Sequence, residues 1–161
     1  NVFGDDGPEQ GLLRLIRSVN NGRFLYLGGR DAVCNYVFVD DVAEASITVA
    51  EHPVAVGKTY NVSDDCTLSE FVDALADELK VARPRYQLPR SFSIPIRTGL
   101  RALRAFPNVS KVSTIARLIS LNNQARFTKT RLTDELGFNC PVGWREGLSR
   151  VVRGYRSQGM L

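Results

Sequence analysis

The stretch 35–45, NYVFVDDVAEA, constrains the fold more than any other part of the sequence, because a short apolar run leads directly into an acidic pair and a helical pattern. Residues 36–39 are aromatic or β-branched, which favours a buried strand. Asp40 or Asp41 can accept hydrogen bonds from the first free N–H groups of the following helix, and Glu44 stands three residues after Asp41, as in a capping box. The sequence therefore predicts a strand that meets a capped helix with almost no loop, a junction common in α/β domains.

Hydrophobic spacing predicts two successive strand–helix units, followed by a largely helical half. Strands are expected at 24–27, 36–39 and 59–62, with a last short one at 85–88. Helices are expected at 11–19, 42–50, 68–79, 110–121, 130–136 and 143–155, and helical spacing also marks the middle of segment 89–107. Thr67 and Glu70 form a capping box before the third helix, and Gly137 is expected to end the fifth.

The composition favours a single globular domain in the cytoplasm. The chain has 161 residues and 43% hydrophobic residues, without an apolar run near the roughly 20 residues that span a bilayer. Its opening sequence, NVFGDDG, lacks the features of a secretory signal. Cys34, Cys66 and Cys140 show no CxxC spacing, so neither a disulfide framework nor a metal site is indicated. The net charge of +4 is carried mainly by scattered arginines, which favour solvated helix faces over a nucleic-acid surface.

A catalytic constellation is hard to build from these residues. His52 is the only histidine and has no motif around it, so a surface role is favoured over that of a general base. The sequence has no HExxH, GxSxG or glycine-lysine phosphate loop. Gly4, Gly7 and Gly11 imitate a dinucleotide-binding loop, but their spacing is loose and only three residues precede them. We therefore interpret them as a turn before the first helix.

The order of the motifs points to a family. The chain contains, in this order, the runs NVFG, LLRLIRSV, FLYLGG, NYVFVDDVAEA, KTYNVSD, TLSEFVDALADEL, LPRSF, FTKTRLTDELGF and WREGLSRVVRGYR. This order resembles the C-terminal half of the NAD(P)-dependent epimerase/dehydratase family, the extended short-chain dehydrogenase/reductases. The resemblance implies an α/β fold, the C-terminal portion of an extended Rossmann-type fold with a few short strands and a mostly helical substrate lobe.

The resemblance also implies how the chain is organised. Residues 1–66 would supply the last cofactor-side strands and helices with part of the substrate lobe, and residues 67–161 would form the mostly helical substrate-binding lobe. Family members bind the nicotinamide cofactor through a GxxGxxG turn and transfer protons with a tyrosine followed four residues later by lysine; the sequence has neither. The cofactor, NAD or NADP, would then be bound mainly by an N-terminal half absent from this chain, which would not be catalytic alone.

By the same resemblance, three groups of residues would contact ligands. Asn1, Val2 and Phe3 would lie beside the nicotinamide. Leu25, Tyr26 and Leu27 would support a nucleotide base or another distal substrate group, with plain sheet packing as the alternative. Pro89, Phe92 and Ile96 would form part of an apolar substrate wall.

Two further positions bear on the substrate and on structure. Cys34 stands where many nucleotide-sugar members carry an arginine that grips the diphosphate, and a thiol cannot make that contact. This favours a sterol-like, flavonoid-like or lipid-like hydroxyl substrate over a nucleotide sugar, unless Arg30 or Arg126 substitutes. Asp41 matches an acidic position of the family and is expected to be a structural cap. Lys129 is expected to pack in the late helical motif rather than contact a ligand.

Three functions remain open from the sequence. The first is an NAD(P)-dependent oxidoreductase, epimerase or dehydratase acting on a hydroxyl or keto carbon, with this chain as its substrate-binding portion. The second is a non-catalytic binding or assembly domain that retains the fold, and the third is a domain that binds phosphate or nucleic acid through arginines. The expected partner is a small-molecule substrate rather than nucleic acid or a membrane, and a homodimer of the full-length protein stays open.

Overall fold

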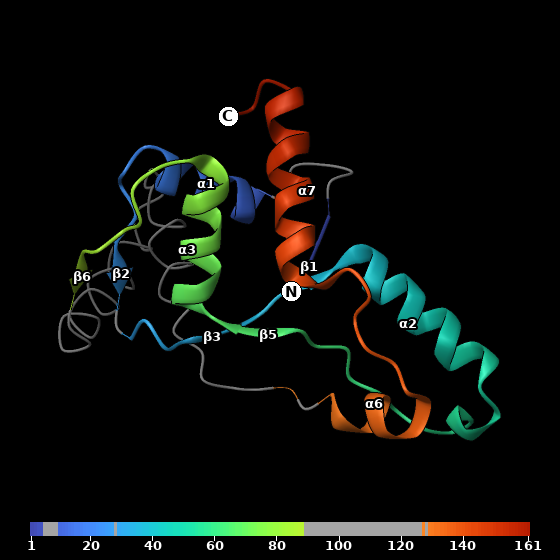
Figure 1. The fold of residues 1–161 in the computed structure, drawn as a ribbon. Coiled ribbons are helices and arrows are strands. Elements are labelled where there is room, and N and C mark those ends of the chain that lie inside the picture. Colours follow the sequence, from blue (N-terminus) through green and yellow to red (C-terminus); the bar gives the residue numbers. More distant parts are fainter. Residues whose placement is uncertain (5–9, 28, 89–126, 128) are drawn as a thin grey trace, which may run out of the picture. The chain divides into compact units, whose positions relative to one another are not determined.

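The computed structural model describes residues 1–4, 10–27, 29–88, 127 and 129–161 (Figure 1). Within them, short strands and five α-helices confirm the α/β class. The elements are β1 (Val2–Phe3), α1 (Gln10–Asn20), β2 (Tyr26–Leu27), β3 (Val33–Asn35), β4 (Val37–Phe38), α2 (Val39–Glu51), the 3-10 turn η1 (Pro53–Ala55), β5 (Asp65–Thr67), α3 (Leu68–Leu79), β6 (Gln87–Leu88), α6 (Thr130–Leu136) and α7 (Gly143–Ser157). The strands pair in twos, as β1–β4, β2–β6 and β3–β5.

The chain divides into two compact units, each made of separate segments. The first contains Asn1–Arg17, Asn35–Cys66 and Ala125–Leu161, and the second contains Ser18–Cys34 and Thr67–Gln124. Each unit therefore takes residues from both sides of residue 66. The predicted division into a cofactor-side part, 1–66, and a substrate-binding part, 67–161, does not coincide with these compact units. It stays a prediction about function.

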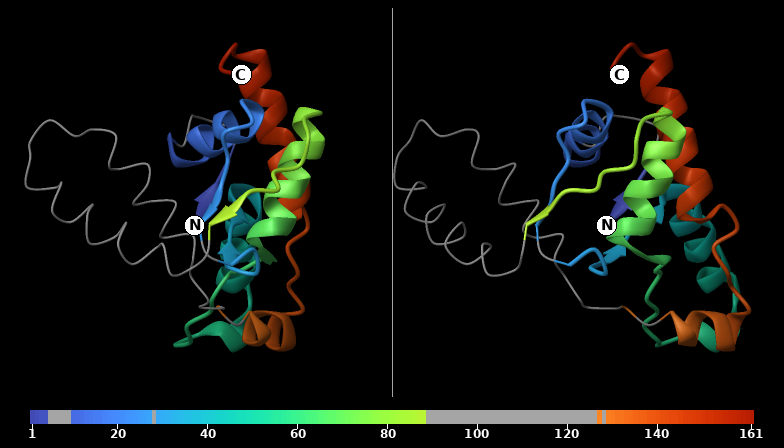
Figure 2. Two further views of the ribbon diagram at one scale, coloured as in Figure 1. Left: turned by 90° about the vertical axis from the view of Figure 1, so that its left-hand side faces the viewer. Right: turned by 60° about the vertical axis from the view of Figure 1, so that its left-hand side comes forward.

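The first unit is organised around the parallel pair β1–β4, in which Val2 lies opposite Val37 and Phe3 opposite Phe38. The ring of Phe3 packs edge-on against Phe38, with ring centroids 5.6 Å apart. Helix α7, red in Figures 1 and 2, packs on β4. Gly147 makes this packing close, because a Cβ atom there would lie 2.5 Å from the Phe38 ring. The predicted apolar side of α7 is confirmed, with these residues all buried: Trp144, Leu148, Val151 and Val152.

Two expected elements of the first unit differ in the structure. The strand predicted at 36–39 is reduced to β4, and α2 begins at Val39 rather than at 42. The strand predicted at 59–62 is absent from the described residues, and a strand forms instead at β5. The reason is tertiary: the Thr59 carbonyl accepts a hydrogen bond from Arg131 (3.3 Å), and the Tyr60 hydroxyl donates to Glu135 (2.8 Å). This segment is therefore bonded to α6, which lies beside it in every view of Figures 1 and 2.

The second unit confirms the local predictions for α3. The Thr67 hydroxyl accepts a hydrogen bond from the Glu70 N–H (3.2 Å), and the Glu70 carboxylate accepts one from the Thr67 N–H (2.7 Å). The apolar face is buried as expected, with these members: Leu68, Phe71, Val72, Leu75, Ala76 and Leu79. The helix ends at Leu79, and the residue after it, Lys80, adopts a left-handed conformation with φ of 58°. Local signals thus predicted the start and the buried face of this helix.

The expected strands at 24–27 and 85–88 form as the shorter elements β2 and β6, which pair in parallel. The N–H of Tyr26 donates to the carbonyl of Tyr86 just before the paired residues (3.0 Å). The predicted helix 110–121 and the segment 89–107 lie outside the described residues. No described helix is long and apolar enough to cross a membrane.

Candidate functional site

Asp41 in the opening junction is a capping residue, but it caps a different helix from the one predicted. Its side chain is fully buried, and its two carboxylate oxygens accept hydrogen bonds from the N–H groups of Val142 (2.8 Å) and Gly143 (2.9 Å). Asp64 accepts the next N–H, from Trp144 (2.7 Å). Two carboxylates therefore cover the start of α7, where free N–H groups and the helix dipole favour negative charge.

The prediction that Asp40 or Asp41 caps α2 is wrong. The N-cap of α2 is Phe38, which makes no side-chain capping hydrogen bond. Asp41 already lies inside the first turn of α2, and its side chain is used by residues about 100 positions later in the chain. The sequence did not reveal that Asp41 caps α7, because a capping signal is recognised from neighbouring residues and α7 begins about 100 residues later.

Beside this cap lies Cys140, which has a strongly perturbed thiol. Burial, together with the negative charges of Asp64 and Asp41, raises the pKa of Cys140 to about 11, while Lys129 opposes the rise. The thiol is therefore neutral near pH 7 and a poor nucleophile. Lys129 Nζ lies 3.6 Å from an Asp64 carboxylate oxygen, which supports the structural role expected for this lysine.

The three residues expected beside the nicotinamide differ in their exposure. The Phe3 side chain is only 2% exposed and belongs to the core, so it offers a cofactor almost no surface. Val2 is 53% exposed, and Asn1 is exposed at the same end of β1. The carbonyl of Asn1 accepts a hydrogen bond from the N–H of Val37 (2.9 Å), which anchors this segment on β4. Contact between a cofactor and Asn1 or Val2 stays a prediction.

Around β2, the structure favours the packing alternative for Tyr26. The Tyr26 side chain is fully buried, its ring packs edge-on against Phe24 (4.9 Å), and the guanidinium of Arg30 stacks on it (4.6 Å). Burial raises the pKa of Tyr26, the negative charge of Asp73 adds to the rise, and Arg30 partly offsets it. Leu25 is half-buried, while the side chain of Leu27 lies outside what the structure describes.

Cys34 lies in β3 and is 3% exposed, so the thiol belongs to the packed interior. Arg30 was one of two residues expected to replace the arginine that many family members carry at the position of Cys34. Its guanidinium lies over the Tyr26 ring. The other predicted ligand residues lie outside the described residues: Pro89, Phe92, Ile96 and Arg126. The structure therefore leaves the substrate wall of segment 89–96 as a prediction.

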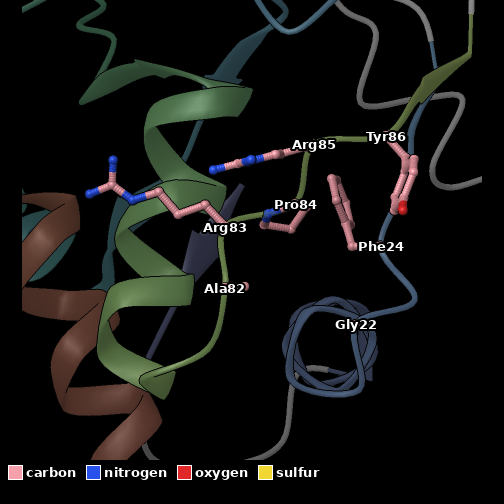
Figure 3. Close-up of a pocket in the computed structure, with 7 residues that line it drawn as sticks. All are labelled: Gly22, Phe24, Ala82, Arg83, Pro84, Arg85 and Tyr86. Atoms are coloured by element: carbon pink, nitrogen blue, oxygen red, sulfur yellow. The ribbon is translucent and has the colours of Figure 1, made fainter.

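The described residues also form a hollow that the sequence did not predict. It has a volume of about 580 Å³ and lies between the connection that follows α1 and the connection from α3 to β6. Its lining residues are Gly22, Phe24, Ala82, Arg83, Pro84, Arg85 and Tyr86 (Figure 3). No local motif marks it, because its two walls are about 60 residues apart in the sequence. Among the described residues, no cluster of three or more His, Cys, Asp or Glu could hold a metal ion.

Comparison with known proteins gives one family match. Residues 1–63 match the NAD dependent epimerase/dehydratase family. The match covers the strand and helix elements from β1 through η1, including the acidic junction at Asp41. No curated protein matches the sequence.

Several solved structures have a similar fold. The structure of gox2253 has a TM-score of 0.71 and 20% sequence identity, over 100% of this chain and 48% of that one. A nucleoside-diphosphate-sugar epimerase from Pseudomonas aeruginosa has a TM-score of 0.67 and 20% identity, over 99% and 47% of the two chains. RMD from the same organism, complexed with NADPH, has a TM-score of 0.60 and 17% identity, over 98% and 46%. The chain thus spans about half the length of these proteins.

These comparisons correct the family assignment made from the sequence. The resemblance was expected over nearly the whole chain, as the C-terminal half of a family member; that assignment is wrong, because the family match lies in residues 1–63, the N-terminal part of this chain. The later motifs are capping boxes and amphipathic helices, which many folds use and which carry little family information. At 20% identity or less, the structural matches show the fold alone.

Proposed function

We propose that this chain is a substrate-binding portion of an NAD(P)-dependent epimerase/dehydratase-like oxidoreductase that acts on a hydroxyl or keto carbon. The observation that carries the proposal is the family match of residues 1–63. It is supported by the fold likeness to the P. aeruginosa epimerase and to the NADPH complex of RMD. The proposed partner is accordingly a small molecule rather than nucleic acid or a membrane.

In this proposal, the chain does not carry out the chemistry alone. Its sequence contains neither a GxxGxxG turn nor a tyrosine followed four residues later by lysine. A bound nicotinamide would supply hydride transfer. The described residues offer it the exposed side chains of Asn1 and Val2, while Phe3 supports β1 from the core. The role proposed for this chain is therefore to bind and orient rather than to move protons.

Cys34 supports an apolar hydroxyl compound as the substrate class. A buried cysteine cannot make the charge-assisted bidentate contacts that an arginine makes with a diphosphate. Arg30 is the described cation close by in sequence, and its guanidinium is stacked on Tyr26. A sterol-like or flavonoid-like alcohol needs no such cation, whereas a nucleotide sugar does.

A thermal-shift panel on the intact protein that contains this chain tests both parts of the proposal. NAD and NADP are each combined with nucleotide-diphosphate sugars or with hydrophobic alcohols. We expect one cofactor to raise the melting temperature, and hydrophobic alcohols to raise it further. Stabilisation by nucleotide sugars alone would overturn the substrate class. Failure of both cofactors to stabilise the protein would favour the alternative, a non-catalytic binding or assembly domain.

A pair of matched variants locates the cofactor on this chain. Val2→Glu places a negative charge at the predicted nicotinamide side of β1, where the native side chain is 53% exposed. Val56→Glu makes the same change in the same unit, just after η1, at a side chain that is 83% exposed. We expect the first variant, and not the second, to reduce the stabilisation by NAD or NADP. Equal effects would remove Val2 from the proposed site.

A further inference from the structure

We propose that the hollow lined by Gly22, Phe24 and residues 82–86 binds a small planar aromatic anion. Its volume of about 580 Å³ is within the range of small-molecule sites, roughly 300–1,000 Å³. Every lining residue that the structure describes belongs to the second compact unit. The proposal goes beyond the proposed function and does not rest on it.

Both walls of the hollow are held in place by backbone hydrogen bonds. On one side, Gly22 has a φ of 65°, and its N–H donates to the Val19 carbonyl (3.0 Å), which closes the turn after α1. On the other side, the N–H of Val81 donates to the Ala76 carbonyl at the end of α3 (3.0 Å). The bond from the Tyr26 N–H to the Tyr86 carbonyl then ties the two connections together. A ligand would therefore meet a preformed surface, which lowers the entropic cost of binding.

The apolar part of the surface suits an aromatic ring. Tyr86 is 77% exposed and offers its ring to a ligand, whereas Phe24 is only 4% exposed and is fixed edge-on against Tyr26, so it forms a small part of the surface. Figure 3 shows the rings of Phe24 and Tyr86 side by side, with Pro84 next to Phe24 and Ala82 farther along the same connection. Ring faces and a proline favour a flat aromatic group, because offset or edge-on ring contacts add to the burial of apolar surface.

The charges favour an anion. Arg83 is already paired, since its guanidinium donates to both carboxylate oxygens of Asp77 (3.0 and 2.7 Å). Arg85 is exposed and makes no ion pair or hydrogen bond with the rest of the described chain. In Figure 3 both arginine side chains extend from the rim, away from Phe24, and none of the seven lining residues drawn there is acidic. Arg85 is thus the cation that can turn toward a carboxylate or phosphate at the edge of a bound ring.

The hollow lies at one particular end of the β2–β6 pair. The lining residues precede β2 and β6 in the sequence, so the hollow lies at the amino ends of this parallel pair. In open α/β sheets, substrates and cofactors bind beyond the carboxyl ends of the strands. The hollow therefore fits an effector or second ligand better than the reacting substrate.

Titration of the full chain with naphthoate tests the proposal, and naphthylmethylammonium serves as the cation with the same ring. Ligand-observed NMR gives both affinities. We expect naphthoate to bind about tenfold more tightly, as one charge-assisted hydrogen bond allows. The Arg85→Gln variant should bring the two affinities close together, and Tyr86→Ala should weaken both about fivefold. Both native side chains are exposed, so both variants are expected to fold.

Two control variants make the same changes elsewhere. Arg14→Gln removes an exposed arginine of α1, and Phe127→Ala removes an aromatic side chain that is 51% exposed. Both residues belong to the first unit, and both variants should leave the affinities unchanged. The proposal is overturned if naphthoate does not bind saturably, if the cation binds as tightly as the anion, or if the controls weaken binding as much as the Arg85 and Tyr86 variants.

Discussion

Removal of the Asp41 carboxylate should destabilise the unit that contains α7. Asp41 is fully buried and accepts the N–H groups of Val142 and Gly143 at 2.8 and 2.9 Å. Hydrogen bonds to a charged group contribute about 1.5–3 kcal/mol each, and loss of a helix cap typically costs about 0.5–2 kcal/mol. The two bonds share one carboxylate and are not additive, so we expect Asp41→Ala to lower the free energy of unfolding by about 3 kcal/mol.

Asp41→Asn should cost about half as much. The amide keeps the shape of the side chain and one acceptor oxygen, but its NH₂ group faces an N–H donor and cannot pair with it. The expected loss is about 1.5 kcal/mol. Asp40→Asn is the control, because Asp40 is the preceding residue and its exposed carboxylate forms a surface ion pair with Arg150 (3.3 Å). Such pairs contribute about 0–1 kcal/mol.

Urea unfolding followed by tryptophan fluorescence measures these changes where they occur. Trp144 is the only tryptophan of the chain, is 8% exposed, and follows directly after the capped residues. With a slope of about 2 kcal/mol per molar urea, a loss of 3 kcal/mol lowers the midpoint by about 1.5 M. If Asp41→Ala shifts the midpoint no further than Asp40→Asn, Asp41 does not cap α7 and the reasoning fails.

Three further changes probe the packing and electrostatics of single residues. Thr67→Ala removes the capping box with Glu70 and should lower the free energy of unfolding by about 1 kcal/mol in urea unfolding followed by circular dichroism, whereas Thr67→Ser should not lower it. Equal stability of the two variants would contradict the cap. Gly147→Ala should lower the free energy of unfolding by about 1–3 kcal/mol, because the added Cβ meets the Phe38 ring. If the free energy of unfolding instead rises by about 1 kcal/mol, as helix propensity alone would give, α7 does not pack so closely on Phe38. In a variant with Cys34 and Cys66 replaced by serine, the alkylation rate of Cys140 should keep rising until the pH approaches about 11, because the folded state favours the protonated thiol. A plateau of the rate near pH 9 would refute the burial of Cys140 beside two carboxylates.

Local signals predicted the helices well. The capping box at Thr67, the six apolar positions of α3, and the stop of α6 at Gly137 are each determined within a few residues of sequence. The apolar side of α7 followed from its spacing in the same way. Such elements are readable because the interactions that define their ends and faces lie within one or two helical turns.

Three of the failures involve remote partners. Tyr60 lies in a run with good strand propensity, yet its hydroxyl bonds to Glu135, 75 residues later. Asp41 was assigned to its own helix, whereas its carboxylate serves α7, about 100 residues later. The hollow beside Phe24 and Tyr86 likewise joins two segments that are distant in sequence. Sequence periodicity carries no information on which remote group satisfies a side chain, so these features required the structure.

Titration of the intact protein with NADH and NADPH, followed by the fluorescence of the reduced nicotinamide, tests the central claim most directly. The proposal that this chain belongs to an NAD(P)-dependent epimerase/dehydratase-like enzyme rests on the match of residues 1–63. We expect saturable binding of at least one cofactor, weakened by Val2→Glu and unaffected by Val56→Glu. Absence of saturable binding of either cofactor to the folded protein would contradict the proposed function.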